Sequence, residues 1–327
     1  MKNPMNRATA RKLFAVATTV LCALGASPLA HAQEAQTDCA IRIGGGPKGK
    51  VYELMIKDMQ AVCGAEVSIC AVPSIGGLPN LMMLSSNQTE LGIAQLDTLQ
   101  VMAGGGDENI AALQAVMPLH TNLLHILALR NGSRVGVTGM PFSGQTQVIR
   151  KFSDLRGLKI AVVGSTQLLG QTLNKQTGFG MELLLAETDD IAIQMLQSNQ
   201  VQAMFTDGGW PLPSSASRLP TSGLALVEFD IPAPPRFSIV QRTYQNLDSF
   251  NNKYLGSTNM LVTRPFKAGG DMGKKVATLQ SCLIRHLEEL KEGRYQAAWK
   301  DIKDPLNTLG VARFTPAIIE KTKVSVR

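Results

Sequence analysis

Short apolar runs alternate with amphipathic segments between residues 159 and 205, and this alternation restricts the fold more than any other feature of the chain. Residues 160–164, 181–185 and 201–205 have the length and apolar character of buried strands. The segments between them begin near Ser165 and Asp189 and carry apolar residues at helical spacing. Strands that alternate with helices predict a parallel sheet, so the expected fold class is α/β.

The same alternation begins near the other end of the chain, where a predicted strand over residues 41–44 runs into a glycine-rich turn. Residues 44–50 read GGGPKGK, and an amphipathic segment follows over residues 51–62. The letters approach a phosphate-binding loop, but Val51 stands where that loop needs a Ser or Thr hydroxyl. Free backbone N–H groups and the positive end of a helix favour an anion. We expect the turn to cradle a small anionic ligand, with a tight turn that binds nothing as the alternative.

Turns rich in glycine or hydroxyl residues follow the predicted strands of both α/β regions. They cover residues 44–50, 74–80, 164–166 and 206–211. The alternation of predicted strands and helices is interrupted near Arg130 and then begins again. A return strand is expected near residue 260. We therefore predict two lobes joined by two crossings, the first from residues 33–130 and 255–327 and the second from residues 131–254. A ligand in such a fold binds between the lobes, at the carboxyl ends of the strands.

Residues 1–32 have the features of a secretory signal, with a basic start, an apolar run and a cleavage pattern that ends at Ala32. Removal of its four basic residues lowers the formal net charge from +7 to +3. A small charge and few aromatic residues exclude nucleic acid as a partner. No later apolar stretch is long enough to span a membrane. We expect a soluble, monomeric protein of the periplasm.

Four cysteines remain after this cleavage: Cys39, Cys63, Cys70 and Cys282. An exported protein favours their pairing in disulfides, and all complete pairings are open. We prefer Cys39–Cys63, because both residues are expected at the same end of the sheet. His120, His125 and His286 have no ligand-like spacing, so we expect no cofactor and no metal site. Whether a metal ion accompanies a carboxylate ligand stays open.

Several short motifs occur in a fixed order along the chain: GGPKGKVY at residues 45–52, SIGG at 74–77, LGIAQLD at 91–97, LRGLKIAV at 155–162 and GGWP at 208–211. Their order resembles the solute-binding proteins of TRAP transporters, specifically the TAXI type, over roughly residues 41–215. The resemblance implies a type II periplasmic binding fold, in which each of two lobes is a mainly parallel sheet flanked by helices and a hinge joins them. It also implies a receptor that captures a small organic anion or amino acid and delivers it to the permease subunits of a transporter.

Carried over by position, the resemblance implies a ligand site formed by both lobes. The first lobe contributes Gly45, Gly46, Lys48, Gly49, Tyr52, Ser74, Gly76, Gly77, Gln95 and Asp97. The second lobe contributes Gly164, Ser165, Thr166, Asp207, Gly208, Gly209 and Trp210. Lysines at positions 48 and 50, and the lack of a Gly-Ser-Gly-Thr run after Val163, leave open a ligand other than the amino acids usual for the family.

Some of these residues have a structural interpretation beside the functional one. Tyr52 suits ligand stacking or core packing, and Trp210 suits the cleft wall or the lobe core. Lys48 either pairs with a carboxylate or is solvated. Asp97 is expected to be a helix N-cap rather than a ligand contact.

We expect a binding protein and not an enzyme. Ser165 at a strand end invites comparison with a nucleophile, but the Gly-x-Ser-x-Gly turn of a serine hydrolase is absent. A serine hydrolase is therefore the weaker alternative. A ligand sensor or an assembly factor on the same fold is the other alternative.

Overall fold

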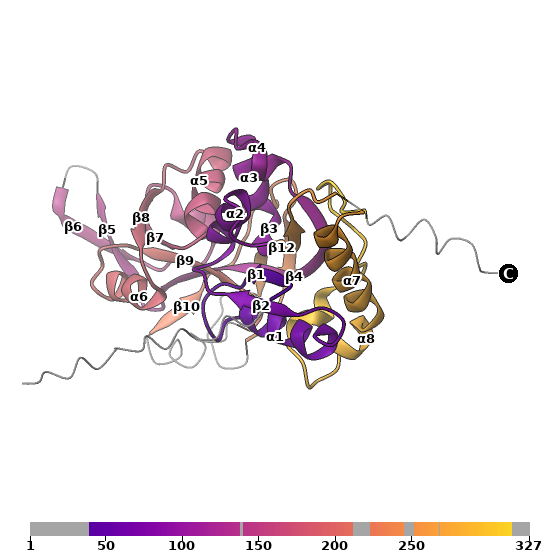
Figure 1. Ribbon diagram of the computed structural model, residues 1–327. Coiled ribbons are helices and arrows are strands. Elements are labelled where there is room, and N and C mark those ends of the chain that lie inside the picture. The colour runs from indigo at the N-terminus through magenta and orange to yellow at the C-terminus, as the bar shows by residue number, and fades with distance from the viewer. Residues whose placement is uncertain (1–38, 138–139, 212–222, 245–251, 268, 316–327) are drawn as a thin grey trace, which may run out of the picture. The chain divides into compact units, whose positions relative to one another are not determined.

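One long strand, β4 (Gln114–Leu129), belongs to both halves of the main sheet (Figure 1). The computed structural model describes residues 39–137, 140–211, 223–244, 252–267 and 269–315, so the predicted signal and its cleavage site lie outside the described residues. Residues 114–124 of β4 pair with β12 (Lys253–Thr263), and residues 123–128 pair with β9 (Ala203–Gly208), both antiparallel. The strand order is β2-β1-β3-β12-β4-β9-β7-β8.

The first parallel group comes from the N-terminal part of the described chain. β1 (Ile41–Gly44) lies between β2 (Ile69–Val72) and β3 (Leu91–Gln95), and all run in the same direction. The helices α1 (Val51–Cys63) and α2 (Gly77–Ser85) connect these strands where the sequence predicts helices. β12 joins this group antiparallel to β3, which confirms the predicted return strand near residue 260.

The second parallel group has the same arrangement. β7 (Lys159–Val163) lies between β8 (Glu182–Ala186) and β9, connected through α5 (Thr166–Thr177) and α6 (Asp189–Gln197). The parallel sheet predicted for residues 159–205 is therefore confirmed. Each group continues into an antiparallel strand, β12 after β3 and β4 after β9.

Shorter elements complete the described structure. They are α3 (Leu96–Gly104), α4 (Glu108–Ala111), the hairpin of β5 (Ser133–Val137) and β6 (Met140–Gln147), η1 (Phe152–Leu155), β10 (Leu224–Leu226), β11 (Ser238–Gln241), α7 (Asp271–Arg285), α8 (Leu287–Leu290) and η3 (Ala297–Asp301). Within the described ranges, no helix combines the length and the apolar character that a membrane crossing needs.

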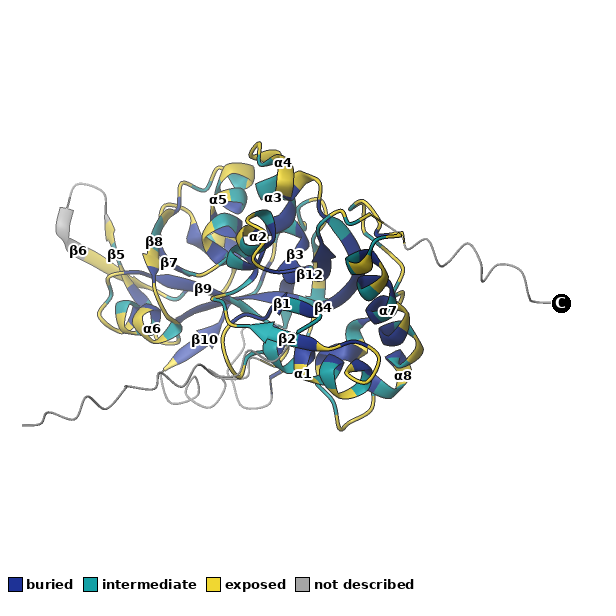
Figure 2. Ribbon diagram, in the orientation of Figure 1, coloured by how far each residue is buried: buried dark blue, intermediate teal, exposed yellow. Residues whose placement is uncertain are grey.

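Each parallel group has its own hydrophobic core. The inner strands are buried, whereas the helices expose their outer faces (Figure 2). In the first core, Met55 and Met59 of α1 and Trp299 of η3 are fully buried. In the second core, Phe152 packs against Phe205 and Phe229. Each parallel group is therefore stabilised by hydrophobic packing of its own.

The disulfides differ from the preferred pairing. The structure joins Cys39 to Cys70 and Cys63 to Cys282, so the expected Cys39–Cys63 bridge is wrong. Cys70 lies on β2, directly beside the start of β1, and its Cα is 5.8 Å from that of Cys39. Cys63 instead ends α1 on the face that packs against α7. Sequence reasoning missed this pair because it did not place α7 against α1.

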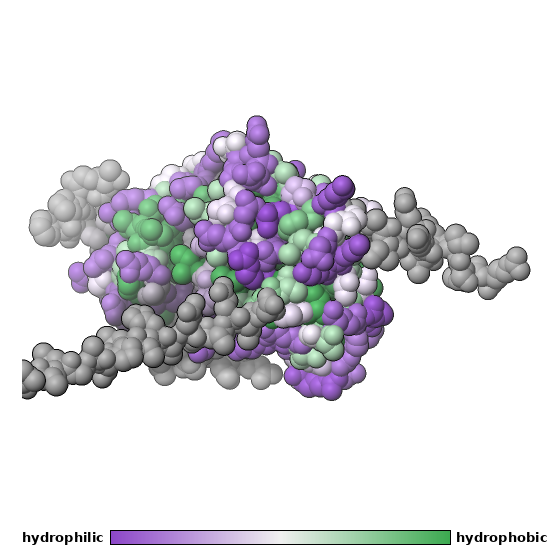
Figure 3. Space-filling view, viewed as in Figure 1, coloured by the Kyte–Doolittle hydropathy of each residue, from purple (hydrophilic) through white to green (hydrophobic). Residues whose placement is uncertain are grey.

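The edge strand β8 presents hydrophobic side chains to solvent. Leu185 is 63% exposed, and hydrophobic surface gathers over β7 and β8 in this view (Figure 3). Exposed apolar patches on a monomer often mark contact surfaces.

Trp299→Phe is expected to lower the free energy of unfolding by about 1.5–3 kcal/mol. Trp299 is fully buried, and its indole Nε1 donates a hydrogen bond to Asp58 Oδ2 at 2.8 Å. The smaller ring leaves both a void and a lost hydrogen bond. Trp210→Phe is the matched control, because Trp210 is 42% exposed. Urea unfolding of both variants tests this prediction, and equal losses would contradict it.

Candidate functional site

A cavity of about 440 Å³ lies where the carboxyl ends of strands from both parallel groups meet. The turns after β1, β2, β7 and β8 and the end of β9 form its walls, and β4 adds one side chain. The lining residues are Pro47, Lys50, Val51, Tyr52, Ile75, Gly76, Gly77, Asn122, Val163, Gly164, Ser165, Glu187, Thr188, Asp189, Thr206, Asp207, Gly208 and Gly209. The cavity is thus at the position where α/β sheets usually bind ligands.

The structure brings part of the predicted site together at this cavity. Lining it are Tyr52, Gly76, Gly77, Gly164, Ser165, Asp207, Gly208 and Gly209. The remaining predicted residues do not line it: Gly45, Gly46, Lys48, Gly49, Ser74, Gln95, Asp97, Thr166 and Trp210. Several of these support the lining residues from behind.

Ser74 connects the first two turns of the wall. Its Oγ accepts hydrogen bonds from the backbone N–H of Gly46 at 3.0 Å and of Gly76 at 3.2 Å, and donates to Asn80 Oδ1 at 2.6 Å. Gly46 has a φ of 67°, a left-handed conformation that favours glycine. Thr166 has a similar role in the second group, because its Oγ1 accepts from the backbone N–H of Val163 at 2.8 Å. Both hydroxyls therefore hold turns in shape.

Lys48, Trp210 and Asp97, which were also predicted for the site, lie outside the cavity lining. Lys48 is exposed to solvent. Trp210 packs edge-on against Tyr244, with ring centroids 6.2 Å apart. The expectation that Asp97 caps a helix is wrong, because α3 begins at Leu96 with Gln95 as its N-cap residue. Asp97 is instead the second residue of α3.

Asp207, at the end of β9, is the acidic centre of the site. Its Oδ2 accepts hydrogen bonds from Ser165 Oγ at 3.0 Å, from Asn122 Nδ2 at 3.2 Å, and from Gln95 Nε2. Gln95 ends β3 in the first parallel group, whereas Ser165 begins α5 in the second. The carboxylate therefore bonds both groups as well as the strand between them.

Burial raises the pKa of the Asp207 carboxyl from 3.8 to about 6. The negative charge of Asp97 contributes to the same rise, while the hydrogen bonds from Ser165, Gln95 and Asn122 oppose it. Burial likewise raises the pKa of Asp97, whose carboxylate accepts a hydrogen bond from Ser257 Oγ. At neutral pH, Asp207 is mostly ionised in a poorly solvated place, so a positive partner would stabilise it.

A neutral polar network lies beside Asp207. The Tyr52 hydroxyl donates to Asn259 Oδ1, and Asn259 Nδ2 donates to the His120 carbonyl oxygen at 3.1 Å. His120 Nε2 lies 3.0 Å from Asn122 Oδ1. Burial lowers the pKa of His120 to about 4 and raises that of Tyr52 well above 10, so neither is charged at neutral pH. Tyr52 is only 8% exposed, so it serves the core and the cavity wall together.

Three helices point their N-termini toward the cavity. Among the described residues, no side chain caps the start of α1, α2 or α5. The cavity is lined by the first residues of α1 and α2 and by Ser165, the N-cap residue of α5. Uncapped N–H groups and the helix dipole give these ends a partial positive charge. Lys50 adds a full positive charge to the same wall. The cavity therefore offers positive potential on these turns and negative charge at Asp207.

Sequence reasoning missed Asn122 and the turn of Glu187, Thr188 and Asp189. That turn follows β8, so the rule that selected residues after strands would have found it. Asn122 gave only a weak signal, a polar residue within a long apolar region. Asn122 lines the cavity because β4 passes between the two parallel groups, and the local sequence does not show that position.

No protein-family model matches the chain, and no curated protein matches its sequence. Among solved structures, it is similar to an amino acid ABC transporter substrate-binding protein from Streptococcus pneumoniae bound to L-arginine. That likeness has a TM-score of 0.49 and 12% identity, and covers 81% of this chain and 96% of that chain. An arginine transport-system periplasmic binding protein from Legionella pneumophila gives a TM-score of 0.47 and 14% identity, over 80% of this chain and 99% of that chain. The effector binding domain of QuiR in complex with shikimate gives a TM-score of 0.45 and 10% identity, over 73% of this chain and 94% of that chain.

Two parallel groups of the same order, with β4 and β12 passing between them, make up a two-lobed type II periplasmic binding fold. The expected fold class is confirmed.

Asp207→Asn is expected to stabilise the ligand-free protein at pH 8 by roughly 1–3 kcal/mol. With a pKa of about 6, the folded protein binds this proton more tightly than the unfolded chain does. The wild-type protein therefore loses stability as pH rises from about 4 to 6, and the neutral amide avoids that loss. Urea unfolding at pH 4 and pH 8 tests this, since the difference should nearly vanish at pH 4. An equal difference at both pH values would contradict the assignment.

Proposed function

We propose that this protein is an extracytoplasmic receptor that captures a small zwitterionic solute, of the amino acid type, between its two lobes. The observation that carries the proposal is the pairing of a half-buried carboxylate, Asp207, with three uncapped helix N-termini around one cavity. A cavity of about 440 Å³ has the size of a small-molecule site.

The charges of the cavity suggest how such a solute lies. Its ammonium group would bind the Asp207 carboxylate, whose hydrogen-bond donors in the described part of the chain, Ser165, Asn122 and Gln95, are all neutral. Its carboxylate would bind Lys50 and the N–H groups at the starts of α1, α2 and α5. Glu187 and Asp189 add negative charge to the wall, which favours a net cationic or neutral zwitterion over a dianion.

The lobes of the proposal are residues 33–130 with 255–327, and residues 131–254. β4 and β12 are the crossing segments, and bending of these strands would open and close the cleft. A solute that touches both lobes stabilises the closed form by its differential affinity for that form. The closed form is then the one that a permease recognises.

We further propose that the receptor works outside the cytoplasm, after removal of the signal segment, and that its partner is a TRAP-type permease. The order of the TAXI-like motifs supports this partner. A sensor or an assembly factor on the same fold is the second candidate. A serine hydrolase is disfavoured, because Ser165 donates its hydroxyl hydrogen to Asp207 and His120 contacts Asn122 and Asn259.

Amino acids are expected to raise the melting temperature of the mature protein in a thermal-shift screen against amino acids, carboxylates and amines. At a hundred times the dissociation constant, a ligand adds about 2.7 kcal/mol of stability. The deaminated analogue of the best amino acid should bind at least about tenfold more weakly, because it cannot pair with Asp207. Tighter binding of dicarboxylates than of every amino acid would contradict the zwitterion assignment.

Asp207→Asn should weaken binding of the best amino acid by at least about tenfold, or 1.4 kcal/mol, in isothermal titration calorimetry. Glu182→Gln is the matched control, because Glu182 is an acid of the same lobe whose side chain is 58% exposed and does not line the cavity. Wild-type affinity in Asp207→Asn would remove Asp207 from the site.

Affinity for an amino acid should fall about tenfold between pH 7.5 and pH 5, because a carboxyl with a pKa near 6 is mostly protonated at pH 5. Asp207→Asn should lose this pH dependence. Binding that strengthens as pH falls would contradict a role for ionised Asp207.

A further inference from the structure

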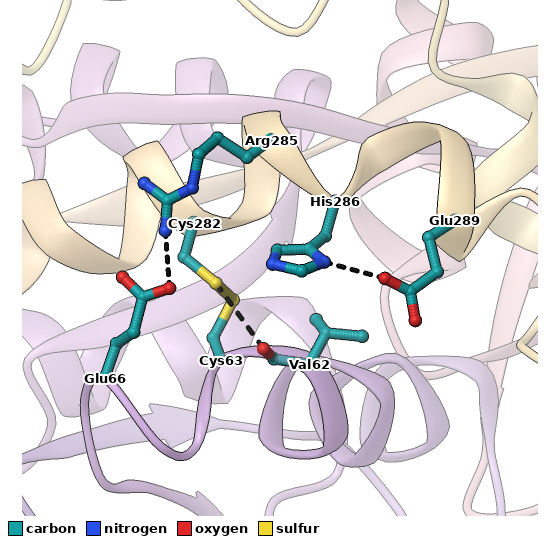
Figure 4. The surroundings of a disulfide bond; sticks show 7 residues. All are labelled: Val62, Cys63, Glu66, Cys282, Arg285, His286 and Glu289. Carbon is teal, nitrogen blue, oxygen red and sulfur yellow. Dashed lines mark hydrogen bonds and ion pairs between the residues drawn. A yellow bond between two sulfur atoms is a disulfide. The ribbon is translucent and has the colours of Figure 1, made fainter.

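A second group of reactive side chains lies at the far end of α1 from the cavity. α1 rises about 18 Å over its length, from the cavity wall to Cys63. Cys63 is joined to Cys282 of α7, with Glu66 and His286 beside the bond (Figure 4). Among the described residues, Glu66, Cys282 and His286 are the one set of three potential metal ligands whose donor atoms all lie within 4.8 Å of one another.

His286 has the orientation that a metal ligand needs. Its Nδ1 lies 2.7 Å from Glu289 Oε2, and Figure 4 shows the other ring nitrogen turned toward the sulfurs. A carboxylate on the second nitrogen is the usual partner of a metal-binding histidine, because it fixes the ring and raises its basicity. Glu289 is itself held by the hydroxyl of Tyr295 at 3.0 Å.

In the oxidised protein, the two sulfurs are bonded to each other and neither is a thiolate. A dithiol reductant of the thioredoxin type supplies two electrons and two protons and becomes a disulfide itself. The Cys63–Cys282 bond then breaks and leaves two thiols. A metal ion that binds them displaces both thiol protons into the solvent. The available donors become two thiolates, an imidazole nitrogen and a carboxylate oxygen.

We propose that reduction of Cys63–Cys282 turns this cluster into a tetrahedral Zn²⁺ site with Cys63, Cys282, His286 and Glu66 as ligands. Two sulfur donors with one nitrogen and one oxygen suit a borderline-soft tetrahedral ion. Zn–S bonds of about 2.3 Å and Zn–N or Zn–O bonds of about 2.0–2.2 Å place the ligands roughly 3.3–3.8 Å apart. The donor atoms of Glu66, Cys282 and His286 already lie within 4.8 Å of one another, and Cys63 Sγ, bonded to Cys282 Sγ before reduction, has to move away from it by less than about 2 Å. Glu66 leaves its ion pair with Arg285 to do so.

The ion would replace the lost covalent bond between α1 and α7. That bond closes a separation of 219 residues, so its loss releases a long segment of chain. A zinc ion on the same residues holds the helices together in the reduced protein. The start of α1, which lines the cavity, then keeps its place. This site does not depend on the proposed function.

The test is metal binding by the reduced, folded protein under anaerobic conditions, with Zn²⁺ in chelator competition and Co²⁺ as the spectroscopic probe. We expect one ion per chain and a thiolate-to-cobalt charge-transfer band with tetrahedral d–d bands. The oxidised protein should show neither. Circular dichroism before metal addition checks that the reduced protein is folded.

Variants separate a built site from cysteines that bind metal without a site. His286→Ala should weaken binding at least about a hundredfold, and Glu289→Gln should weaken it about 10–100-fold. Glu288→Gln is the control, because Glu288 is 86% exposed and pairs with Lys291. If the reduced protein unfolds, the Cys63→Ser variant replaces it in the test. This variant frees the Cys282 thiol without any reductant, so Cys39–Cys70 stays oxidised, and it should still give a weaker, thiolate-bound Co²⁺ signal. No stoichiometric binding in either protein, or equal affinity in His286→Ala and wild type, overturns the proposal.

Discussion

The antiparallel pairing of β4 with two different strands is the constraint on which the rest of the structure depends. One strand that pairs with β12 along its first part and with β9 along its second must pass from one parallel group to the other. The carboxyl ends of both groups are thereby brought to a common cavity. Turns that lie far apart in the sequence, such as residues 75–77 and 206–209, line one cavity. In the proposed receptor, this connection is where the two lobes would bend.

Asp207 lies where the two parallel groups meet, and its carboxylate interacts with residues of both. Its carboxylate gathers donors from β3, β4 and α5, and its burial makes the negative charge costly without a cation. The same burial strengthens the attraction to an ammonium group, because little water screens it. In the proposed receptor, stability of the empty protein and affinity for a solute are therefore opposed at this residue, as is common in binding sites.

Local patterns predicted the helices, strands and turns well, because strand length, helical spacing and glycine-rich turns depend on residues that are close together in the sequence. Gly164, Ser165 and Asp207 lie in turns that were predicted in this way, and they line the cavity. Their role in ligand binding stays a prediction. The contributions of Asn122 and of the Cys63–Cys282 bond could not be predicted in this way, because they depend on which distant segments pack together. Buried polar residues such as His120 also interrupt the apolar pattern of β4, so the strand resembles two shorter ones. Asp97 was misplaced because helix ends shift by a residue or two between local patterns and structure.

The most direct test of the account is a crystal structure of the mature protein with the amino acid that binds it best. The account predicts the ligand in the cavity between the parallel groups, with its ammonium group within hydrogen-bond distance of Asp207 and its carboxylate at the N-termini of α1, α2 or α5. A ligand bound elsewhere, or one whose carboxylate faces Asp207, would contradict it.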